Sequence, residues 1–318
     1  MEKKQKSGRK DLPMKILVTG GDGQLGRALQ KVLPQKNSVF TTRADFDITN
    51  QKQTIKQIAG DRPNIVIHAA AYTNVDGCEQ NPEIAYKVNV DGTKNIAAAC
   101  KEIGAKLIYI STDFVFDGKK KTPYSENDKP NPLSVYGKTK LQGEEAVKKL
   151  PDYIIIRTSW LFGDGPAFAK ASAGKQNFVQ TILKLVEEKD EIKVVNDQIG
   201  SPTYALDLAE AIYQLIKNCS GIYHISNSGQ CSWHQFAQEI MRQKGFKTKI
   251  LPINSGAWQK MRPDSAKRPK YSVLSHKKIN TLGIRTSRFA REPCRSFHSL
   301  IKMRPWQDAL RDYLETIS

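Results

Sequence analysis

The stretch Val18-Thr19-Gly20-Gly21-Asp22-Gly23-Gln24-Leu25-Gly26 decides the fold of this 318-residue chain. It directly follows a β-branched apolar run at residues 16–19 and opens a helical pattern over residues 25–33. Its spaced glycines permit a tight turn, let backbone N–H groups approach a pyrophosphate and bring the helix close to the sheet. A glycine triple also occurs at ordinary strand-to-helix turns, so its meaning depends on what surrounds it.

Short β-branched runs alternate with helical stretches along much of the chain. The predicted strands are 16–19, 38–41, 65–69, 106–110, 153–157 and 192–195. The predicted helices are 25–33, 82–103, 132–150, 177–188, 204–217, 233–244 and 306–317. Near-continuous apolar strands separated by helices are typical of a parallel sheet covered on both faces. The predicted fold is therefore α/β, a Rossmann-like doubly wound parallel sheet with a smaller, mixed α/β substrate domain.

The domain division follows from where this alternation weakens. Residues 14–157 and about 192–217 are expected to form the dinucleotide-binding domain. Residues of about 158–191 and 218–318 are expected to form the substrate domain. Residues 1–13 carry five Lys or Arg without apolar periodicity, so we expect a disordered basic extension.

The formal net charge of +18 raises the question of a nucleic-acid partner. Residues 256–304 hold thirteen Lys or Arg against Asp264 and Glu292, a net charge of +11. A basic region with few aromatics could bind the phosphates of a nucleic acid. It could equally hold a small pyrophosphate ligand or be a solvated surface, and the sequence favours these two. We therefore expect no nucleic-acid partner.

Other global features point to a soluble, cytoplasmic protein without a membrane partner. No apolar run approaches the roughly 20 residues of a membrane span, and no signal peptide precedes the first strand. The five cysteines are widely spaced and odd in number, which is typical of free thiols in a reducing compartment. None of the five histidines has ligand spacing with another, so no metal site is predicted.

A second informative stretch is Tyr136-Gly137-Lys138-Thr139-Lys140. In a helix over residues 132–150, Tyr136 and Lys140 share one face and reach each other. A nearby ammonium group favours the phenolate and lowers the phenol pKa from its free value of about 10. The pair predicts a tuned acid beside the dinucleotide turn, although the same spacing occurs on many surface helices.

Two further strand ends contribute to the same crevice. His68-Ala69-Ala70-Ala71-Tyr72 closes the third strand with small side chains, as close approach of a cofactor requires, although alanines there are also ordinary packing. Thr112 follows the fourth strand at the carboxyl edge of the sheet, where ligands of open α/β folds bind. We expect it to face the crevice of Tyr136 and Lys140.

The end of the second strand bears on the choice of nicotinamide cofactor. An acidic residue there binds the ribose hydroxyls of NAD, whereas an arginine accommodates the extra phosphate of NADP. Residues of both kinds are present here, because the basic Arg43 precedes the acidic Asp45 and Asp47. Arg43 favours NADPH, with NADH left open, and Asp47 is expected at the adenine end.

The GxxGxxG spacing and five later stretches resemble the extended short-chain dehydrogenases and, within them, the dTDP-4-dehydrorhamnose reductase family. Those stretches are 111–118, 132–140, 157–163, 197–204 and 304–310, and the matches extend over nearly everything from Met14 onward. The resemblance implies NAD(P)H-dependent reduction of the 4-keto group of dTDP-4-dehydro-L-rhamnose to dTDP-L-rhamnose. This reaction belongs to nucleotide-sugar and cell-surface polysaccharide biosynthesis.

The resemblance also implies roles for individual residues. The implied catalytic triad is Thr112, Tyr136 and Lys140. The cofactor residues, from the resemblance and from the turn and strand ends, are Gly20, Gly23, Gln24, Leu25, Gly26, Arg43, Asp47, Ile48, Ala71, Tyr72, Thr73, Tyr136 and Lys140. The implied contacts to the deoxysugar are Thr112, Asp113 and Trp160.

Two departures from the family pattern matter. Members with a metal-bridged dimer carry a glutamate where this chain has Ala28, which weakens the case for magnesium and for that dimer. A monomer and a homodimer both stay open. Residues near 166–175 and 285–300 interrupt the pattern and are interpreted as inserted loops.

Two other functions also stay open. The regulatory subunit of methionine adenosyltransferase resembles this family and keeps the Tyr-Gly-Lys-Thr-Lys run. Thr112 and residues 157–160 argue against that non-catalytic regulator, which lacks them in this form. A nucleotide-sugar epimerase or dehydratase would need further acid or base residues near Thr112, and Asp113 is the only such neighbour in the sequence.

Overall fold

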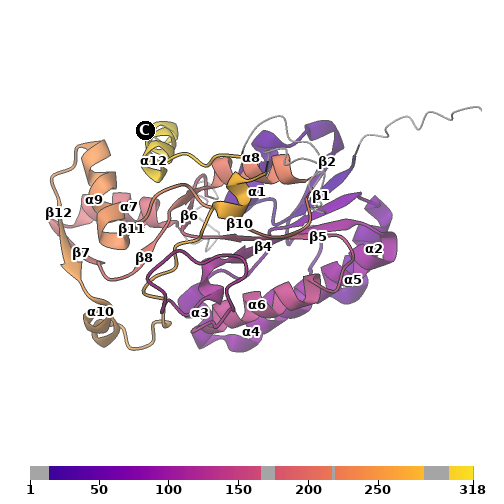
Figure 1. Cartoon of the computed structure of the whole chain (residues 1–318), viewed down its shortest axis with the longest axis horizontal. Helices are drawn as coiled ribbons and strands as arrows, with labels where there is room; N and C mark the ends of the chain where they lie inside the picture. Colours follow the sequence, from indigo (N-terminus) through magenta and orange to yellow (C-terminus); the bar gives the residue numbers. More distant parts are fainter. Residues whose placement is uncertain (1–13, 166–175, 217–218, 283–300, 318) are drawn as a thin grey trace, which may run out of the picture.

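The protein is built around one large parallel sheet (Figure 1). The structure is a computed structural model that describes residues 14–165, 176–216, 219–282 and 301–317. Its six strands are all parallel to their neighbours, in the order β10-β5-β4-β3-β1-β2. Their bounds are Ile16–Thr19 (β1), Ser38–Thr41 (β2), Ile65–His68 (β3), Lys106–Thr112 (β4), Tyr153–Thr158 (β5) and Gly221–His224 (β10). This confirms the predicted doubly wound α/β fold.

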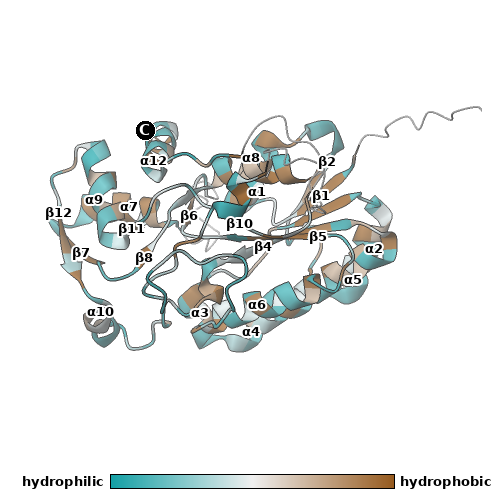
Figure 2. Cartoon of the chain, in the orientation of Figure 1, coloured by the Kyte–Doolittle hydropathy of each residue, from teal (hydrophilic) through white to brown (hydrophobic). Residues whose placement is uncertain are grey.

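Helices cover both faces of the sheet because its strands are apolar on both sides. On β1, Ile16 and Val18 belong to the core formed with one helix layer, and Leu17 belongs to the core on the other face. The first layer holds α1 (Gln24–Val32), α8 (Ala205–Leu215) and α11 (Lys277–Asn280). The second holds α2 (Gln51–Asp61), α5 (Thr93–Ile103) and α6 (Val135–Val147). Figure 2 shows the apolar strands between helices with polar outer faces.

Shorter helices lie around this frame. The predicted helix over 82–103 is split into α4 (Pro82–Tyr86), a π-helical turn at Lys87–Gly92 and α5, and α3 (Val75–Gln80) precedes it. Two 3₁₀ turns lie at Gln35–Asn37 and Asp113–Val115. π-helical turns are frequent at functional sites, and this one contains the buried residue Asn89.

A smaller part of the molecule has its own core. The parallel strands β7 (Glu191–Val195) and β12 (Lys249–Ile253) pack with α7 (Phe178–Glu188), α9 (Trp233–Lys244) and α12 (Trp306–Thr316). Helix α10 (Ser255–Met261) follows β12. Two pairs of short strands complete it, β6 (Leu161–Phe162) with β9 (Thr203–Tyr204) and β8 (Ile199–Gly200) with β11 (Cys231–Ser232).

The large sheet differs from the prediction in one strand. The segment 192–195 forms β7, but it pairs with β12 and does not join the large sheet. Glu191 and Lys193 are exposed on this strand while Ile192 is buried, an alternation that suits a sheet with one buried face. The sixth strand of the large sheet is instead β10, from a segment expected in the substrate domain. The predicted membership of the large sheet therefore needs correction at residues 192–195 and 221–224.

The cysteine prediction holds only in part. Cys78, Cys100 and Cys231 are free and buried. Cys219 is disulfide-bonded, so the expectation of free thiols is wrong at this position. Wide spacing in the sequence does not prevent pairing, because the fold brings distant segments together. The basic extension and both predicted insertions fall wholly or mostly outside the described residues.

Across the described ranges, no helix combines the length and apolarity that crossing a bilayer requires.

A buried ion pair holds α6 against the sheet. The side chains of Glu144 and Arg157 are 0% and 1% exposed. Arg157 donates from Nε to Oε1 of Glu144 at 2.9 Å and from Nη2 to Oε2 at 2.7 Å. The Ser111 hydroxyl donates to the same Oε1 at 2.6 Å. Because both side chains are buried, loss of one charge leaves the other buried without compensation.

We predict that Arg157→Met lowers the free energy of unfolding by about 3 to 5 kcal/mol, because it strands the Glu144 carboxylate. Urea unfolding followed by circular dichroism measures this loss. Arg242→Met is the matched control, since Arg242 pairs with Glu239 in a similar two-bonded geometry at the surface of α9 and should matter far less. Equal losses in the two variants would contradict the assigned role of the buried pair.

Candidate active site

A cleft of about 710 Å³ lies at the carboxyl ends of the central strands. The strand order reverses between β1 and β3, and ligands of doubly wound sheets bind at such a point. The sheet, α6 and the glycine turn form one side, and residues of the smaller part form the other. The predicted site residues that line it are Gly20, Gly23, Gln24, Leu25, Gly26, Ala71, Thr73, Thr112, Asp113, Tyr136, Lys140 and Trp160.

The glycine turn has the geometry that an anion site needs. Gly20 has a φ of +72°, and a Cβ there would lie 2.8 Å from the backbone nitrogen of Ala70. Helix α1 begins after Gly23, which has no side chain to occupy the N–H groups of the first turn. Free N–H groups and the helix dipole favour an anion at this end. The turn can therefore hold the pyrophosphate of a dinucleotide.

The predicted catalytic residues come together from β4 and α6. Thr112 ends β4, and Tyr136 lies in the first turn of α6, which the Ser134 hydroxyl caps by accepting the Gly137 N–H at 3.1 Å. A Cβ at Gly137 would lie 2.2 Å from the Phe114 carbonyl oxygen, so only glycine lets α6 approach the end of β4 this closely. A side-chain hydrogen bond with Thr112 acts on the Tyr136 phenol.

The predicted acidification of Tyr136 by Lys140 is wrong. Burial raises the pKa of Tyr136 above its ordinary value, and the hydrogen bond with Thr112 offsets only part of this rise. Lys140 is 2% exposed, and burial lowers its pKa to about 7 against the opposing effect of Glu144. Its Nζ lies 4.1 Å from the centre of the Tyr109 ring. Loss of water is thus the largest cause of both pKa shifts, and neither group of the pair is among the causes acting on the other.

Asn89 does not line the cleft but supports two of the segments that do, and it was missed from the sequence. It lies in the π-helical turn and is 1% exposed. Its Oδ1 accepts the Tyr72 N–H at 2.8 Å, and its Nδ2 donates to the Thr139 hydroxyl at 3.1 Å. It therefore joins the loop after β3 to the helix of Tyr136. A lone asparagine inside a helical pattern has no sequence signal that could have found it.

Four predicted cofactor residues do not line the cleft: Arg43, Asp47, Ile48 and Tyr72. Arg43 is exposed after β2, and its charge acts on Asp47. The pKa of Asp47 is lowered, chiefly by the Thr49 N–H that it accepts at 2.9 Å. The side chain of Ile48 packs in the core instead. Contacts of these four residues with a cofactor stay a proposal.

Asp113 is buried at the inner end of the cleft. It is 2% exposed and accepts the Ser272 hydroxyl at 2.5 Å and the Thr112 hydroxyl at 3.1 Å. Burial raises the pKa of Asp113 to about 7, although these hydrogen bonds oppose the rise. Its carboxyl group can therefore either accept or donate a hydrogen bond near neutral pH.

Trp160 lines the cleft as predicted. Its φ is +45°, an unusual conformation for a residue other than glycine and one that is found at functional sites. Its ring stacks on Trp233, with centroids 3.5 Å apart and an interplanar angle of 8°. The two rings form an apolar wall opposite the sheet.

The lining residues that were not singled out from the sequence include Trp233, Trp258, Arg262 and Arg268. The two arginines belong to the basic region over 256–304, so its excess charge was the available signal. Two tryptophans 25 residues apart, by contrast, have no sequence pattern that places them at one cleft. Within the described ranges, no cluster of three or more His, Cys, Asp or Glu could hold a metal ion.

Comparison with known proteins agrees with this geometry. The model of the family described as RmlD substrate binding domain matches residues 14–318. The spore coat polysaccharide biosynthesis protein SpsK of Bacillus subtilis (strain 168) is 42% identical, covering 95% of this chain and 97% of SpsK. The dTDP-4-dehydrorhamnose reductase of Escherichia coli (strain K12) is 36% identical, covering 84% and 91%.

A solved structure agrees as well. The dTDP-4-dehydrorhamnose reductase of Bacillus anthracis str. Ames, crystallised in complex with NADP, has a TM-score of 0.84 and 36% identity, covering 96% of this chain and 100% of that one. With the family model matched from residue 14 to the end, the chain belongs to the dTDP-4-dehydrorhamnose reductase (RmlD) family.

Proposed function

We propose that this protein is an NADPH-dependent reductase that converts dTDP-4-dehydro-L-rhamnose to dTDP-L-rhamnose. The observation that carries this proposal is the meeting of Thr112, Tyr136 and Lys140 in the cleft that the glycine turn also lines. Relatives named as dTDP-4-dehydrorhamnose reductases support the substrate, and the structure in complex with NADP supports the cofactor. The likeness to SpsK supports a role in polysaccharide biosynthesis, and we expect the reaction in the cytoplasm.

The residues of the cleft suit a nicotinamide dinucleotide. The N–H groups at the start of α1 would hold its pyrophosphate, because the capping residue Gly23 has no side chain to occupy them. Arg43, exposed after β2, would meet the extra phosphate that distinguishes NADPH from NADH. NADPH supplies the hydride that reduces the ketone.

Side chains of the protein would supply the proton that the reduced ketone takes up. Thr112 and Tyr136 would hold the C4 carbonyl oxygen, and Tyr136 would donate its proton as negative charge develops there. The raised pKa keeps the phenol protonated until that moment. Lys140, when charged, would stabilise the phenolate that remains. Positioned proton transfer of this kind contributes about 10² to 10⁴ in rate.

The apolar wall of Trp160 and Trp233 suits a deoxysugar. Trp160 and Trp233 would face the carbon framework of a deoxysugar, which has fewer hydroxyls to satisfy. Asp113 would fix a sugar hydroxyl from the inner end. The non-catalytic alternative has no observation in its favour, because Thr112 is in place beside Tyr136 and the named relatives are reductases.

The direct test is to incubate the purified protein with dTDP-4-keto-6-deoxy-L-mannose and to follow the loss of absorbance from NADPH and, separately, from NADH. We expect oxidation with NADPH and less with NADH. Failure to oxidise either cofactor would contradict the reductase proposal.

We predict that Tyr136→Phe lowers kcat about 10²- to 10⁴-fold, because it removes the hydroxyl to which we assign the proton transfer. The Kd for NADPH, measured by fluorescence titration, should stay nearly unchanged since the ring is kept. Tyr153→Phe is a matched control, because Tyr153 lies at the start of β5, at the opposite end of this strand from Thr158, and does not line the cleft. Full activity of Tyr136→Phe would mean that the acid is elsewhere.

We predict that Arg43→Ala raises the KM for NADPH about tenfold and leaves the KM for NADH within about twofold, because only NADPH has the phosphate that Arg43 would meet. Steady-state kinetics with each cofactor gives both values. Arg62→Ala removes a charge of the same kind from the end of α2 and is the control. An equal rise for both cofactors would argue against this role of Arg43.

A further inference from the structure

We infer that Tyr109 is a positioning residue for Lys140, and that its aromatic ring holds the lysine in the charged form beneath the active site. The inference deepens the proposed function and rests on it, because there Lys140 stabilises the phenolate that Tyr136 leaves. The Nζ of Lys140 lies over the Tyr109 ring, 4.1 Å from its centre. The face of an aromatic ring carries partial negative charge, so it stabilises a cation without a carboxylate partner.

The place of Tyr109 follows from the match between strand β4 and helix α6, which contact each other along the sheet (Figure 1). Alternate residues of a strand face the same side, and residues four apart share one face of a helix. Tyr109 accordingly belongs to the core on the α6 side of the sheet, and its neighbour Ile108 to the core on the other side. Ser111, two residues further on, donates to Glu144, four residues after Lys140. Two positions of β4 thus meet two successive turns of α6.

The ring fits under the helix because α6 has a glycine at position 143. A Cβ on Gly143 would lie 2.2 Å from the Tyr109 hydroxyl oxygen, so any side chain there would displace the phenol or the helix. The Tyr109 hydroxyl donates to the backbone carbonyl of Lys140 at 3.3 Å. The Tyr109 side chain is fully buried. The ring is therefore a fixed part of the surroundings of Lys140.

The ring matters because Lys140 has little other compensation for its burial. Lys140 is 2% exposed, and no residue that the structure describes forms a hydrogen bond or an ion pair with its Nζ. Glu144 favours the charged lysine, but its carboxylate already accepts two hydrogen bonds from Arg157 and one from Ser111. A buried ammonium group without a close partner tends to lose its proton. The aromatic face opposes that loss.

The other titratable groups around Lys140 and Tyr136 do not supply this contact. They are His68 on β3, Asp113 just after β4, Cys78 on α3, and the ion pair of Glu144 on α6 with Arg157 on β5. Burial, and after it the charge of Lys140, lowers the pKa of His68 to about 3, so its ring is neutral near neutral pH. Asp113 and Cys78 act on the Tyr136 phenol. Among the described residues, Glu144 and the Tyr109 ring are thus the groups that favour a charged Lys140.

Loss of the ring should let Lys140 release its proton at lower pH. Burial lowers the pKa of Lys140 to about 7. A desolvated cation–π contact is strong enough to move such an equilibrium by about one pH unit. Because charged Lys140 stabilises the phenolate, kcat should fall as the pH rises through this pKa. Without the ring, that descending limb of the pH profile should move to lower pH.

The test changes the charge on the ring face at nearly constant shape. Tyr109→Phe keeps the ring and loses the hydroxyl, and fluorinated phenylalanines placed at position 109 by nonsense suppression withdraw charge from the ring face in steps. The titration of Lys140 is followed by NMR of the full-length protein labelled with [¹³Cε]lysine, and Lys140→Met identifies its signal. We expect Tyr109→Phe to leave the pKa of Lys140 within about 0.3 pH units of the wild type, and the trifluorinated ring to lower it by about one pH unit.

Two further variants control for packing and for the general effect of losing a ring. Tyr109→Leu removes the aromatic face and should lower the pKa of Lys140 as far as the trifluorinated ring does; where this variant fails to fold, the fluorinated series decides alone. Tyr223→Leu is the matched control, because Lys278 Nζ lies 4.4 Å from the centre of that ring on β10 and neither residue lines the cleft. It should leave the Lys140 titration and the pH profile of kcat within about 0.2 pH units.

Two results of the titration overturn the inference. One is a Lys140 pKa that is the same with phenylalanine and with the trifluorinated ring. The other is an equal fall in Tyr109→Phe and Tyr109→Leu, since the hydroxyl would then be responsible. A titration that follows the ring while the descending limb of kcat stays in place overturns the link to catalysis.

Failure of the inference and failure of the proposed function give different results, because the NMR titration needs no turnover. An active reductase whose Lys140 titration does not depend on the ring overturns the inference alone. A ring-dependent titration in a protein that oxidises neither NADPH nor NADH supports the contact between the ring and Lys140 and overturns the reductase.

Discussion

The buried pair of Glu144 and Arg157 is the constraint on which the active site depends. One carboxylate takes hydrogen bonds from Ser111 at the end of β4 and from Arg157 on β5, so a single helix position is tied to two strands. Arg157 also lies 3.4 Å from the Nε2 of His224 on β10. Helix α6 thereby stands at a fixed place relative to the strand ends, and its first turn presents Tyr136 to Thr112. The charge that fixes the helix also acts on Lys140.

Burial has the same effect on three groups of the site. It raises the pKa values of Tyr136 and Asp113 and lowers that of Lys140, so each group is pushed toward its neutral form. A phenol kept protonated is a poor base but a ready proton donor once a negative oxygen forms beside it. The site is therefore organised to stabilise charge that develops during reduction. The direction of the Tyr136 pKa shift could not be predicted from the sequence, because the spacing of Tyr136 and Lys140 says nothing of how much water is removed.

The sequence predicts best where one physical rule acts alone. Strands β1, β3, β4 and β5 were found because burial leaves nearly continuous apolar runs, and the glycine turn because its backbone geometry excludes other residues. Strand β7 was assigned to the wrong sheet, since a pattern shows burial but not the partner. Strand β10 is four residues long and was missed. Trp233, Arg262 and Arg268 reach the cleft only because the second core folds that part of the chain over it, which no local pattern encodes.

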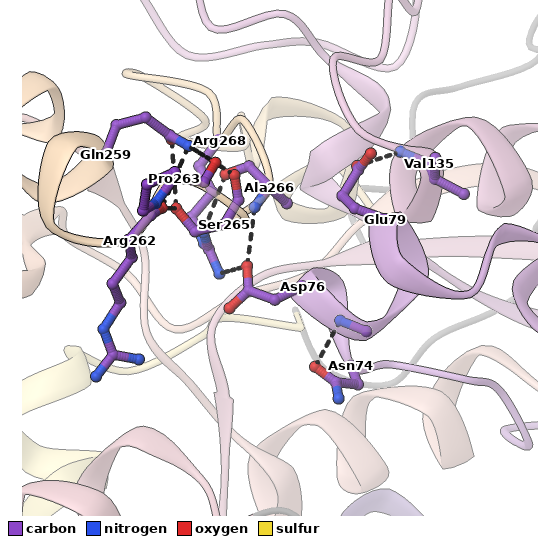
Figure 3. A network of polar contacts seen from close by, with 11 residues as sticks. Asn74, Asp76, Glu79, Val135, Gln259, Arg262, Pro263, Ser265, Ala266 and Arg268 are labelled. Atoms are coloured by element: carbon purple, nitrogen blue, oxygen red, sulfur yellow. Dashed lines mark hydrogen bonds and ion pairs between the residues drawn. The ribbon is translucent and has the colours of Figure 1, made fainter.

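Helix α3 connects two parts of the cleft wall. Asp76 in its first turn accepts hydrogen bonds from the Arg268 guanidinium and from the backbone N–H of Ala266. Glu79, one turn later, accepts the N–H of Val135 at 2.7 Å, next to Tyr136 (Figure 3). The loop that carries Arg268 and the helix that carries Tyr136 thus share one short anchor. A bimolecular reaction gains most when both reacting parts are held in one geometry. Because α3 bonds to both, it fixes the part of the cleft wall at Arg268 relative to Tyr136.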